Sequence, residues 1–574
     1  MKRLLKYLKG YTKECILGPL FKLLEASLEL IVPLVVAAMI DNGIERGDTG
    51  YIVRSAIVLA LLGAVGLVFS VTAQFFAAKA AVGFTARLRH ALFGKVGELS
   101  YAELDRVGTS SLITRMTADC NTVQSGTNLT LRLLLRSPFV VFGAMIMAFT
   151  VDVPSAVTFA IVIPALSVVV FGIMLISIPL YKRVQKRLDR VLFTTRENIQ
   201  GARVIRAFCR EDEEIEAFRE ENGALTVAQN FVARISNLLN PLTYALINIA
   251  TLFLIYKGAL RVDLGELSQG EVVALYNYMG QILVELIKLA SLIISITKAL
   301  ASATRIADTL ELTSSMANGS RAYEVKGDEV LRFENVSLRY PEAGEDSLSG
   351  ISFSVKRSET VGIIGGTGSG KSSLVNLIPR FYDATGGKIY LYGEELSSYD
   401  IESLREQIGV VPQKAVLFKG TLRDNMKWGR ADATDEEISA AIATAQATEV
   451  VADKGGLDAE IEAGGRNLSG GQRQRLTVAR ALVKRPDILI LDDSASALDF
   501  ATDAALRQAL RRDTADTTVF IVSQRASSLL YADKIIVLDD GEAVAIGTHT
   551  ELLEACSLYR EIYETQFQKG GESA

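Results

Sequence analysis

Six long apolar stretches in the first half of the sequence constrain the fold more than any other feature. A helix needs about 20 mostly apolar residues to cross the hydrocarbon core of a bilayer. Because lipid cannot hydrogen-bond the backbone, stretches of this kind must be helical. The stretches are Ile16–Ile40, Ile57–Ala78, Leu133–Val151, Ser155–Leu180, Leu238–Tyr256 and Val272–Ile296. We therefore predict an α-helical polytopic membrane domain with six transmembrane helices.

The distribution of lysine and arginine predicts which connections face the cytosol. The segments Arg87–Arg136 and Lys182–Arg234 are rich in positive charge, whereas the connections Val151–Pro154 and Val262–Gly270 contain no lysine or arginine. Positive charge favours the inner side of the membrane, so both termini are predicted to be cytoplasmic. The start, Met1–Lys13, has the pattern of a basic amphipathic helix at the membrane interface. We interpret it as part of a retained segment and not as a signal peptide.

The two inner segments predict helices that extend beyond the membrane. They are helical in pattern and too polar for lipid, so the second to fifth membrane helices should continue tens of Å into the cytosol. We place the turns at their tips at Gly108–Thr114 and Glu197–Gly201. The predicted domains are a membrane domain at residues 1–312, a small polar linker at 313–328 and a soluble domain at 329–574.

Composition agrees with a membrane half joined to a soluble half. The chain has 574 residues, of which 49% are hydrophobic and 22% are charged, with a net charge of −5. The charge gives no basic footprint for nucleic acid, so we expect no nucleic-acid partner. Two histidines leave little for a histidine-ligated metal, and four scattered cysteines suggest reduced thiols without a redox role. These residues are His90, His549, Cys15, Cys120, Cys209 and Cys556.

The second half of the chain changes to the pattern of an α/β domain. Ile351, Phe353 and Val355 alternate with polar residues, which predicts a half-buried antiparallel strand. The continuous apolar runs Ile488–Leu491 and Val519–Val522 are typical of buried parallel strands. Near the end, the pair Asp540-Gly541 predicts a hairpin turn between two further strands.

A glycine-rich loop directly after a predicted strand carries the clearest chemistry. Residues 365–372 fit the pattern G-x-x-x-x-G-K-[ST] between the apolar strand Val361–Ile364 and a helix. Such a loop wraps phosphates with backbone N–H groups, while Lys371 neutralises phosphate oxygens and Ser372 binds Mg²⁺. This predicts a P-loop that binds ATP and Mg²⁺. The candidate nucleotide-binding residues here are Gly365, Thr367, Gly368, Ser369, Gly370, Lys371, Ser372 and Ser373.

A second element follows the P-loop at a suitable distance. The apolar strand Ile488–Leu491 ends in Asp492, whose carboxylate could hold Mg²⁺ through water. Many buried strands end in aspartate, so this residue alone would be a weak signal. Together with the P-loop it predicts a metal-nucleotide site that includes Ser372 and Asp492.

The string Leu468-Ser469-Gly470-Gly471-Gln472 is the most specific in the chain. With it, the soluble half resembles the ATPase domain of ABC transporters, and the whole chain resembles an ABC half-exporter. The resemblance implies a dimer in which ATP lies between the P-loop of one ATPase domain and this signature string of the other. Ser469 and the two glycine amides would form the second anion site at a helix start. A simple helix cap is the structural alternative.

Further positions match the family residue by residue. The resemblance places Tyr340 where an aromatic ring stacks on adenine, and Gln413 where a loop glutamine touches Mg²⁺ and contacts the membrane domain. It places Ser496 and Asp499 in a loop that crosses the dimer interface. Tyr340 could instead be a core aromatic of a strand, and Asp499 could be an ordinary helix cap.

Two positions depart from the family pattern. Active members have a glutamate after the strand-end aspartate and a histidine in the switch loop, but this chain has Asp493 and Gln524. Asp493 is one methylene shorter, and a displacement of about 1 Å can lower a rate ~10²-fold. Gln524 can donate a hydrogen bond but cannot become a cation. We therefore expect ATP binding to survive better than hydrolysis at this degenerate site.

The intact signature beside an impaired P-loop side resembles one subunit of the heterodimeric bacterial ABC exporters. On this interpretation the signature completes a partner's active site, and the partner is a homologous half-transporter. One alternative is a homodimeric exporter of lipid or peptide with slow aspartate sites. Another is a nucleotide-gated regulator or channel. The resemblance also implies a multi-pass protein of the cell inner membrane.

Polar residues inside the predicted membrane helices are the only indication of a substrate. Glu285, Tyr276 and Asn240 are the candidate cavity residues. Glu25 and Glu29 share a helical face and are expected to pack against other helices. An amphiphilic substrate, drug-like or lipid-like, and contact with membrane lipids are family-level expectations, and no residue selects among drugs, lipids and peptides.

Overall fold

The computed structural model describes residues 2–341, 343–494 and 496–568. The chain divides into two compact units. The first contains Met1–Gly97 and Ser110–Leu312, and the second contains Glu98–Thr109 and Thr313–Ala574. The short segment 98–109 therefore packs with the second unit although it lies within the first half of the sequence.

The first unit is built from long helices, and six helical stretches in the described residues are long and apolar enough to cross a membrane. This confirms the predicted six-helix domain. The longest single helix has 55 residues, or about 80 Å at ~1.5 Å per residue, so it extends well beyond a bilayer core, as predicted. The helices of the unit are α1 (Thr12–Met39), α2 (Thr49–Glu98), α4 (Thr109–Thr114), α5 (Cys120–Leu133), α6 (Arg136–Val151), α7 (Val153–Ala207), α8 (Glu211–Ser236), α9 (Leu239–Asp263) and α10 (Gln269–Leu310), with wider π-helical turns at Ile40–Ile44 and Arg115–Asp119.

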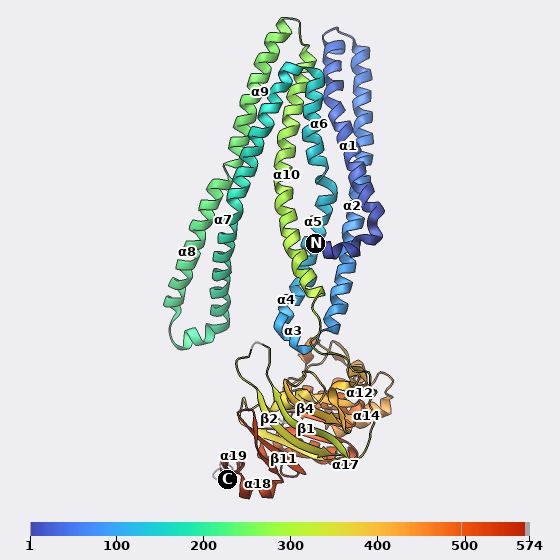
Figure 1. The fold of residues 1–574 in the computed structure, drawn as a ribbon, viewed down its shortest axis with the longest axis vertical. Helices are drawn as coiled ribbons and strands as arrows, with labels where there is room; N and C mark the ends of the chain where they lie inside the picture. The colour runs from blue at the N-terminus through green and yellow to red at the C-terminus, as the bar shows by residue number, and fades with distance from the viewer. Residues whose placement is uncertain (1, 342, 495, 569–574) are drawn as a thin grey trace. The chain divides into compact units, whose positions relative to one another are not determined.

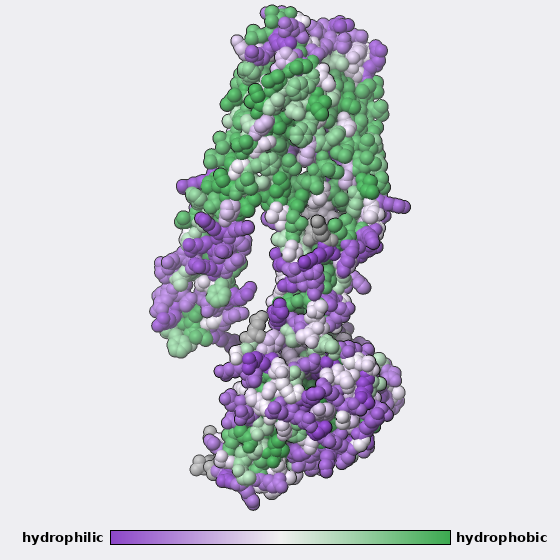
Figure 2. Space-filling view, viewed as in Figure 1, coloured by the Kyte–Doolittle hydropathy of each residue, from purple (hydrophilic) through white to green (hydrophobic). Residues whose placement is uncertain are grey.

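The surface of the first unit changes character along its helices. Figure 2 shows a continuous hydrophobic zone over the upper part of the unit and hydrophilic residues over the lower ends of α7 and α8. Large apolar side chains such as Leu61 and Leu67 on α2 are mostly exposed. An exposed apolar surface of this extent is typical of helices that face lipid.

Of the two predicted turns, one is misplaced and the other is confirmed only at its first residue, Gly108. Glu197–Gly201 lies inside α7, and the chain turns only at residues 208–210. The residues after Gly201 continue the helix, and α8 then begins with four consecutive acidic residues, which suit the positive end of a helix dipole. At the other tip the chain leaves the helix at Leu99–Ser100 and again at Gly108, whose φ of 78° suits glycine, whereas Thr109–Thr114 is helical.

The N-terminal segment is helical, as its pattern predicts. Lys2–Tyr11 forms a 3₁₀ helix. Leu4 is buried against residues of α2, α5 and α10, whereas Leu5 is exposed. Arg3 forms an ion pair with Glu311 just after α10. Packing against these helices, in addition to amphipathicity, therefore fixes this segment.

A buried ionic cluster joins α1, α6 and α10 within the apolar core of the first unit. The guanidinium of Arg136 contacts Glu285 and Glu29 at N–O distances of 2.5 Å each. Ser137 donates to Glu285 at 2.8 Å, and Lys288 contacts Glu285 at 2.9 Å. Buried charges are stable only when paired and hydrogen-bonded in this way. The expectation that Glu29 packs against other helices agrees with this arrangement.

The second unit is the predicted α/β domain, and it has two main sheets. One sheet is antiparallel in the order β2-β1-β4-β5, and the other has the order β12-β11-β3-β10-β9-β6 with parallel pairing from β11 to β6. A small sheet pairs β7 with β8. The strands are β1 (Glu329–Leu338), β2 (Leu348–Lys356), β3 (Thr360–Gly365), β4 (Gly386–Leu391), β5 (Glu394–Glu395), β6 (Ile408–Val411), β7 (Gly420–Thr421), β8 (Glu460–Ile461), β9 (Ile488–Asp492), β10 (Thr518–Val522), β11 (Lys534–Asp539) and β12 (Glu542–Gly547).

Helices surround these sheets. The strand patterns seen in the sequence are confirmed: β2 is antiparallel, β9 and β10 are parallel, and Asp540-Gly541 turns between β11 and β12. The helices are α3 (Tyr101–Val107), α11 (Lys371–Leu377), α12 (Ile401–Glu406), α13 (Leu422–Lys427), α14 (Asp435–Thr444), α15 (Thr448–Lys454), α16 (Gly470–Val483), α17 (Phe500–Asp513), α18 (His549–Ala555) and α19 (Ser557–Gln568).

The short helix α3 belongs to this second unit through aromatic contacts. The ring of Tyr101 lies 4.6 Å from that of Phe381, centroid to centroid. The hydroxyl of Tyr382 donates to Asp105 at 2.5 Å. A capping box formed by Ser100 and Glu103 starts the helix. Specific side-chain contacts therefore hold α3 against the residues that follow α11.

We expect Arg136→Met to destabilise the protein strongly, because it leaves Glu285 buried without its main partner. Breaking a buried ion pair costs about 3–5 kcal/mol, whereas an exposed pair contributes about 0–1 kcal/mol. The thermal unfolding temperature in detergent should fall for Arg136→Met and recover in part when Glu285→Gln is added. Arg3→Met, which removes a pair whose side chains are 64% and 49% exposed, is the control and should change little. Equal unfolding temperatures for all variants would contradict the conclusion that Arg136 stabilises the buried Glu285.

Candidate functional site

The P-loop lies between β3 and α11, as the sequence predicts. Its backbone takes positive φ values at Gly368 (88°) and Gly370 (92°), a conformation that glycine adopts without strain. The hydroxyl of Ser369 donates to the carbonyl of Gly366 at 2.9 Å, and the ammonium of Lys371 donates to the carbonyl of Gly365 at 2.9 Å. The loop is therefore closed on itself, with a buried ammonium at the start of a helix.

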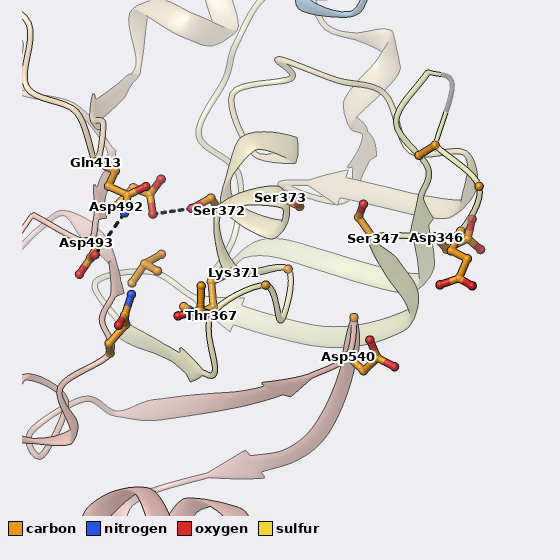
Figure 3. Close-up of a pocket in the computed structure, with 18 residues that line it drawn as sticks. Asp346, Ser347, Thr367, Lys371, Ser372, Ser373, Gln413, Asp492, Asp493 and Asp540 are labelled. Carbon is orange, nitrogen blue, oxygen red and sulfur yellow. Dashed lines mark hydrogen bonds between the residues drawn. The ribbon is translucent and has the colours of Figure 1, made fainter. Parts of the chain in front are cut away.

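Two aspartates at the end of β9 face this loop. Figure 3 shows the hydroxyl of Ser372 directed at Asp492 and the amide of Gln413 directed at Asp493. The first hydrogen bond measures 3.0 Å and the second measures 3.4 Å. Asp493 has a φ of 44°, so the chain turns sharply directly after the strand.

A pocket of about 700 Å³ connects these groups. It brings together most of the predicted nucleotide-site residues with several that sequence analysis missed. The predicted residues that line it are Thr367, Gly368, Gly370, Lys371, Ser372, Ser373, Gln413, Asp492, Asp493 and Gln524. The additional lining residues are Ala343, Gly344, Glu345, Asp346, Ser347, Val522, Asp540 and Gly541. The sequence predicts a turn at Asp540-Gly541, but no pattern in the sequence indicates that residues 343–347 line a site.

Burial perturbs the charged groups of the pocket. It lowers the pKa of Lys371, and the nearby Asp493 and Asp492 oppose this effect. It raises the pKa of Asp492, with a further contribution from the charge of Asp493. It also raises the pKa of Asp493, against the hydrogen bond from Gln413. Two carboxylates and one ammonium in a polar hollow form a site suited to a polyphosphate with its counter-cation.

The oxygen ligands present fit a magnesium ion. Ser372, Asp492 and Gln413 carry a hydroxyl, a carboxylate and an amide, and all three line the same pocket. Mg²⁺ prefers oxygen ligands and is usually bound by one or two protein groups together with substrate phosphates. Among the described residues no group of three or more His, Cys, Asp or Glu could hold a metal on its own. A cation here would therefore depend on the phosphates it accompanies.

Tyr340 lies beside the pocket and not among the described residues that line it. Its hydroxyl donates to Ser373 at 3.1 Å, and its ring meets Tyr382 edge-on at 4.9 Å between centroids. Tyr382 in turn donates to Asp105 of α3. A chain of side-chain contacts thus runs from α3 to the P-loop helix. The stacking of Tyr340 on adenine stays a prediction.

The signature residues and Asp499 both cap helices, which is the structural alternative noted for each. The hydroxyl of Ser469 accepts from the amide of Gln472 at 3.2 Å, and the side chain of Gln472 accepts from the amide of Ser469 at 2.9 Å. Asp499 accepts from the amide of Thr502 at 2.8 Å. Leu468, Gly470, Gly471 and Ser496 are not among the described lining residues of the pocket. Their roles opposite a second chain stay predictions.

The C-terminal helix braces the loop that carries Gln524. The side-chain amide of Gln566 on α19 donates to the carbonyl of Gln524 at 2.8 Å and accepts from the amide of Ala526 at 2.8 Å. One side chain therefore fixes the backbone on both sides of Arg525. On the same C-terminal part of the domain, the Nδ1 of His549 lies 2.8 Å from the hydroxyl of the buried Tyr559, which is a structural contact. No sequence pattern indicated Gln566.

The comparisons with known proteins assign both halves of the chain. The sequence model of the ABC transporter transmembrane region matches residues 15–286, and that of the ABC transporter domain matches residues 348–496. The chain is 35% identical over 576 residues to YfiB of Bacillus subtilis, an uncharacterized ABC transporter ATP-binding protein, with 100% of each chain covered. It is 34% identical to Rv1273c of Mycobacterium tuberculosis, with the same description, covering 98% of this chain and 97% of the relative.

Further similarities concern export and fold. The chain is 31% identical to YgaD of Bacillus subtilis, a putative multidrug export ATP-binding/permease protein, with 99% of each chain covered. A solved structure of a bacterial Atm1-family ABC exporter with ATP bound has a TM-score of 0.80 at 23% identity, covering 98% of this chain and 99% of that one. This likeness shows that the two proteins share a fold.

We expect Asp493→Asn to raise the thermal stability of the nucleotide-free protein at neutral pH. The raised pKa of Asp493 means that the folded state holds its proton more tightly than the unfolded chain. The ionised carboxylate therefore opposes folding above that pKa, and the gain from Asp493→Asn should shrink as the pH falls through it. Asp499→Asn is the control, because backbone hydrogen bonds from Thr502 lower the pKa of Asp499. A gain in thermal stability from Asp493→Asn that grows as the pH falls would refute a destabilising role of the ionised Asp493.

We expect Gln566→Ala to weaken nucleotide binding, because the loop of Gln524 loses both of its braces. Neutral hydrogen bonds contribute about 0.5–1.5 kcal/mol each, so the loss of both should raise the dissociation constant for a fluorescent ATP analogue about 5- to 150-fold. Thr565→Ala, which changes a neighbouring exposed residue of α19, is the matched control. An unchanged constant for Gln566→Ala would show that the brace does not position Gln524.

Proposed function

This chain belongs to the ABC transporter family, and we propose that it is one subunit of a heterodimeric exporter in which its own ATP site is degenerate. The family assignment makes it a multi-pass membrane protein with a fused ATPase domain that couples ATP hydrolysis to export. We propose that residues 1–312 carry the transport pathway, that 313–328 are a linker and that 329–574 bind nucleotide. We also propose a location in the cell inner membrane with both termini in the cytoplasm.

The observation that carries the heterodimer is the contrast between two parts of the ATPase domain. Asp493 and Gln524 line the pocket with Lys371, yet neither is the residue that active members of the family use. Asp493 has a shorter reach than glutamate, and Gln524 cannot carry a positive charge. The signature Ser469–Gln472 is intact and forms a well-made helix start. An intact signature is useful only if it completes a site that hydrolyses ATP.

The residues of this chain have separable roles in the proposed cycle. Lys371 and the P-loop amides bind the phosphates, while Ser372, Asp492 and Gln413 hold Mg²⁺, which neutralises phosphate charge when bound. Asp493 orients water poorly from its shorter side chain, so ATP stays bound for longer at this site. Ser469, Gly470 and Gly471 bind the γ-phosphate of the ATP held by the partner. Closure of the two ATPase domains then favours the outward-open state of the membrane helices.

The substrate is proposed to be a small amphiphile. Relatives described as multidrug exporters support this class. In the first unit, a hollow of about 500 Å³ is lined by Glu285 and Tyr276, two of the three predicted cavity residues. Asn240 is not among the described residues that line it.

The decisive experiment compares two variants of the native complex. We expect Ser469→Ala to lower ATP hydrolysis by at least tenfold, because it damages the partner's fast site. Asp493→Asn should change hydrolysis less than twofold, because it alters only the slow site. Mass spectrometry of the gently solubilised complex should show a second, different chain of similar size. Two copies of this chain, together with complete loss of hydrolysis in Asp493→Asn, would instead establish a homodimer with working aspartate sites.

A further inference from the structure

The hollow in the membrane unit has a composition that specifies more than an amphiphile. Its lining residues come from α1, α9 and α10, three helices that Figure 1 labels. Apolar side chains, including Ile247, Leu283 and Val284, form part of its wall. The rest of the wall is polar, with both charged and uncharged side chains. Which of these polar groups are free determines what the hollow can bind.

The charged groups are already paired with one another. Arg136, just behind the wall, contacts Glu29 and Glu285, and Lys288 contacts Glu285. Glu285 accepts a further hydrogen bond from Ser137 and is almost completely buried. Two acids and two bases give the cluster no net charge. A cationic ligand would therefore have to compete with Arg136 and Lys288 for the carboxylates.

The uncharged polar groups are the ones that are free. Among the hydrogen bonds of the described residues, none involves the side chains of Tyr244, Asn248, Thr251 or Tyr276, although all four line the hollow. The amide oxygen of Gln281, which also lines it, is buried without a hydrogen-bond partner. Unpaired polar groups at membrane depth are costly, because lipid offers them no hydrogen bonds. Tyr244, Asn248 and Tyr276 are exposed, so this cost falls on the buried amide oxygen of Gln281. A bound molecule with hydrogen-bonding groups would satisfy that oxygen and reach the exposed groups as well.

We propose that this hollow binds an amphiphile whose head carries no net charge and several hydroxyl or amide groups. Tyrosine and threonine hydroxyls and the side-chain amides of Asn248 and Gln281 offer both donors and acceptors, which match such a head. The exposed rings of Tyr244 and Tyr276 provide flat apolar faces beside it. The apolar wall residues suit the lipid-like part. The inference rests on the proposed exporter function only in treating the bound molecule as the substrate.

Equilibrium binding to the nucleotide-free complex tests the proposal without requiring transport. The probes are a fluorescent short-chain glucosylceramide, whose head is uncharged and rich in hydroxyls, and rhodamine 6G, an amphiphilic cation. We expect the glucosylceramide to bind at least tenfold more tightly. Equal binding, or tighter binding of the cation, would overturn the proposed head-group class.

Single-hydroxyl variants locate the binding site. Tyr244→Phe and Tyr276→Phe each remove one oxygen and keep the ring, so each should raise the dissociation constant for glucosylceramide about two- to tenfold. Tyr256→Phe on α9 is the matched control, because Tyr256 is exposed and is not among the described residues that line the hollow. Unchanged affinity in both pocket variants, or an equal loss in the control, would refute the assignment to this hollow.

ATP-dependent movement in proteoliposomes then separates the two proposals. Movement of glucosylceramide that is lost in the pocket variants supports both. In another outcome, glucosylceramide binds and ATP is hydrolysed, but no probe moves. That result would support binding in the hollow and refute a role of the hollow in export. Movement of the cation alone would overturn the head-group class and leave the exporter function intact.

Discussion

The parallel register of β3, β10 and β9 is the constraint on which the chemistry of this protein depends. Val522 of β10 pairs with Ile363 of β3 on one side and with Asp492 of β9 on the other. Because all three strands run in the same direction, their carboxyl ends meet at one edge of the sheet. The P-loop, the two aspartates and the loop of Gln524 each leave the sheet at that edge. Residues separated by more than 150 positions in the sequence thus reach one pocket.

The membrane unit and the ATPase domain handle buried charge in opposite ways. Around Arg136 every charge has a partner of opposite sign, so the cluster is stable without a ligand. Around Lys371 the charges are incompletely matched, because two carboxylates face one ammonium. Burial lowers the pKa of Lys371 and raises the pKa values of Asp492 and Asp493, which favours the neutral form of each group. Binding of a phosphate with its cation would relieve that mismatch. The first arrangement is suited to structure, and the second is suited to a site that must bind and release a highly charged molecule.

The sequence predicts the elements of the fold well because each depends on local pattern. Apolar length identifies the six membrane segments, and the strand, glycine-rich loop and helix around Lys371 follow in order. The turn predicted at Glu197–Gly201 was misplaced because Gly201 is tolerated within α7, whereas at the other tip the helix does break at Gly108. Propensity alone cannot distinguish these two glycines.

Residues that act through tertiary contacts could not be found in this way. Gln566 reaches the loop of Gln524 from 42 positions away, and α3 lies against Tyr382 from 277 positions away. No periodicity links such residues. The pairing of Glu285 with Arg136 likewise joins helices distant in sequence, so the sequence shows that these charges exist but not that they neutralise each other.

The proposed asymmetry between the two ATP sites would have a mechanical consequence. In the proposed heterodimer, an ATP molecule that is bound but slowly hydrolysed would keep one half of the dimer interface closed while the other half opens and exchanges nucleotide. The contacts from Ser373 through Tyr340 and Tyr382 to Asp105 on α3 link the P-loop helix to a segment continuous with the membrane helices. A P-loop that stays occupied would therefore hold α3 in one arrangement for most of the cycle. The larger movement would then fall to the partner, and this chain would act as the steadier half against which the partner's half opens and closes.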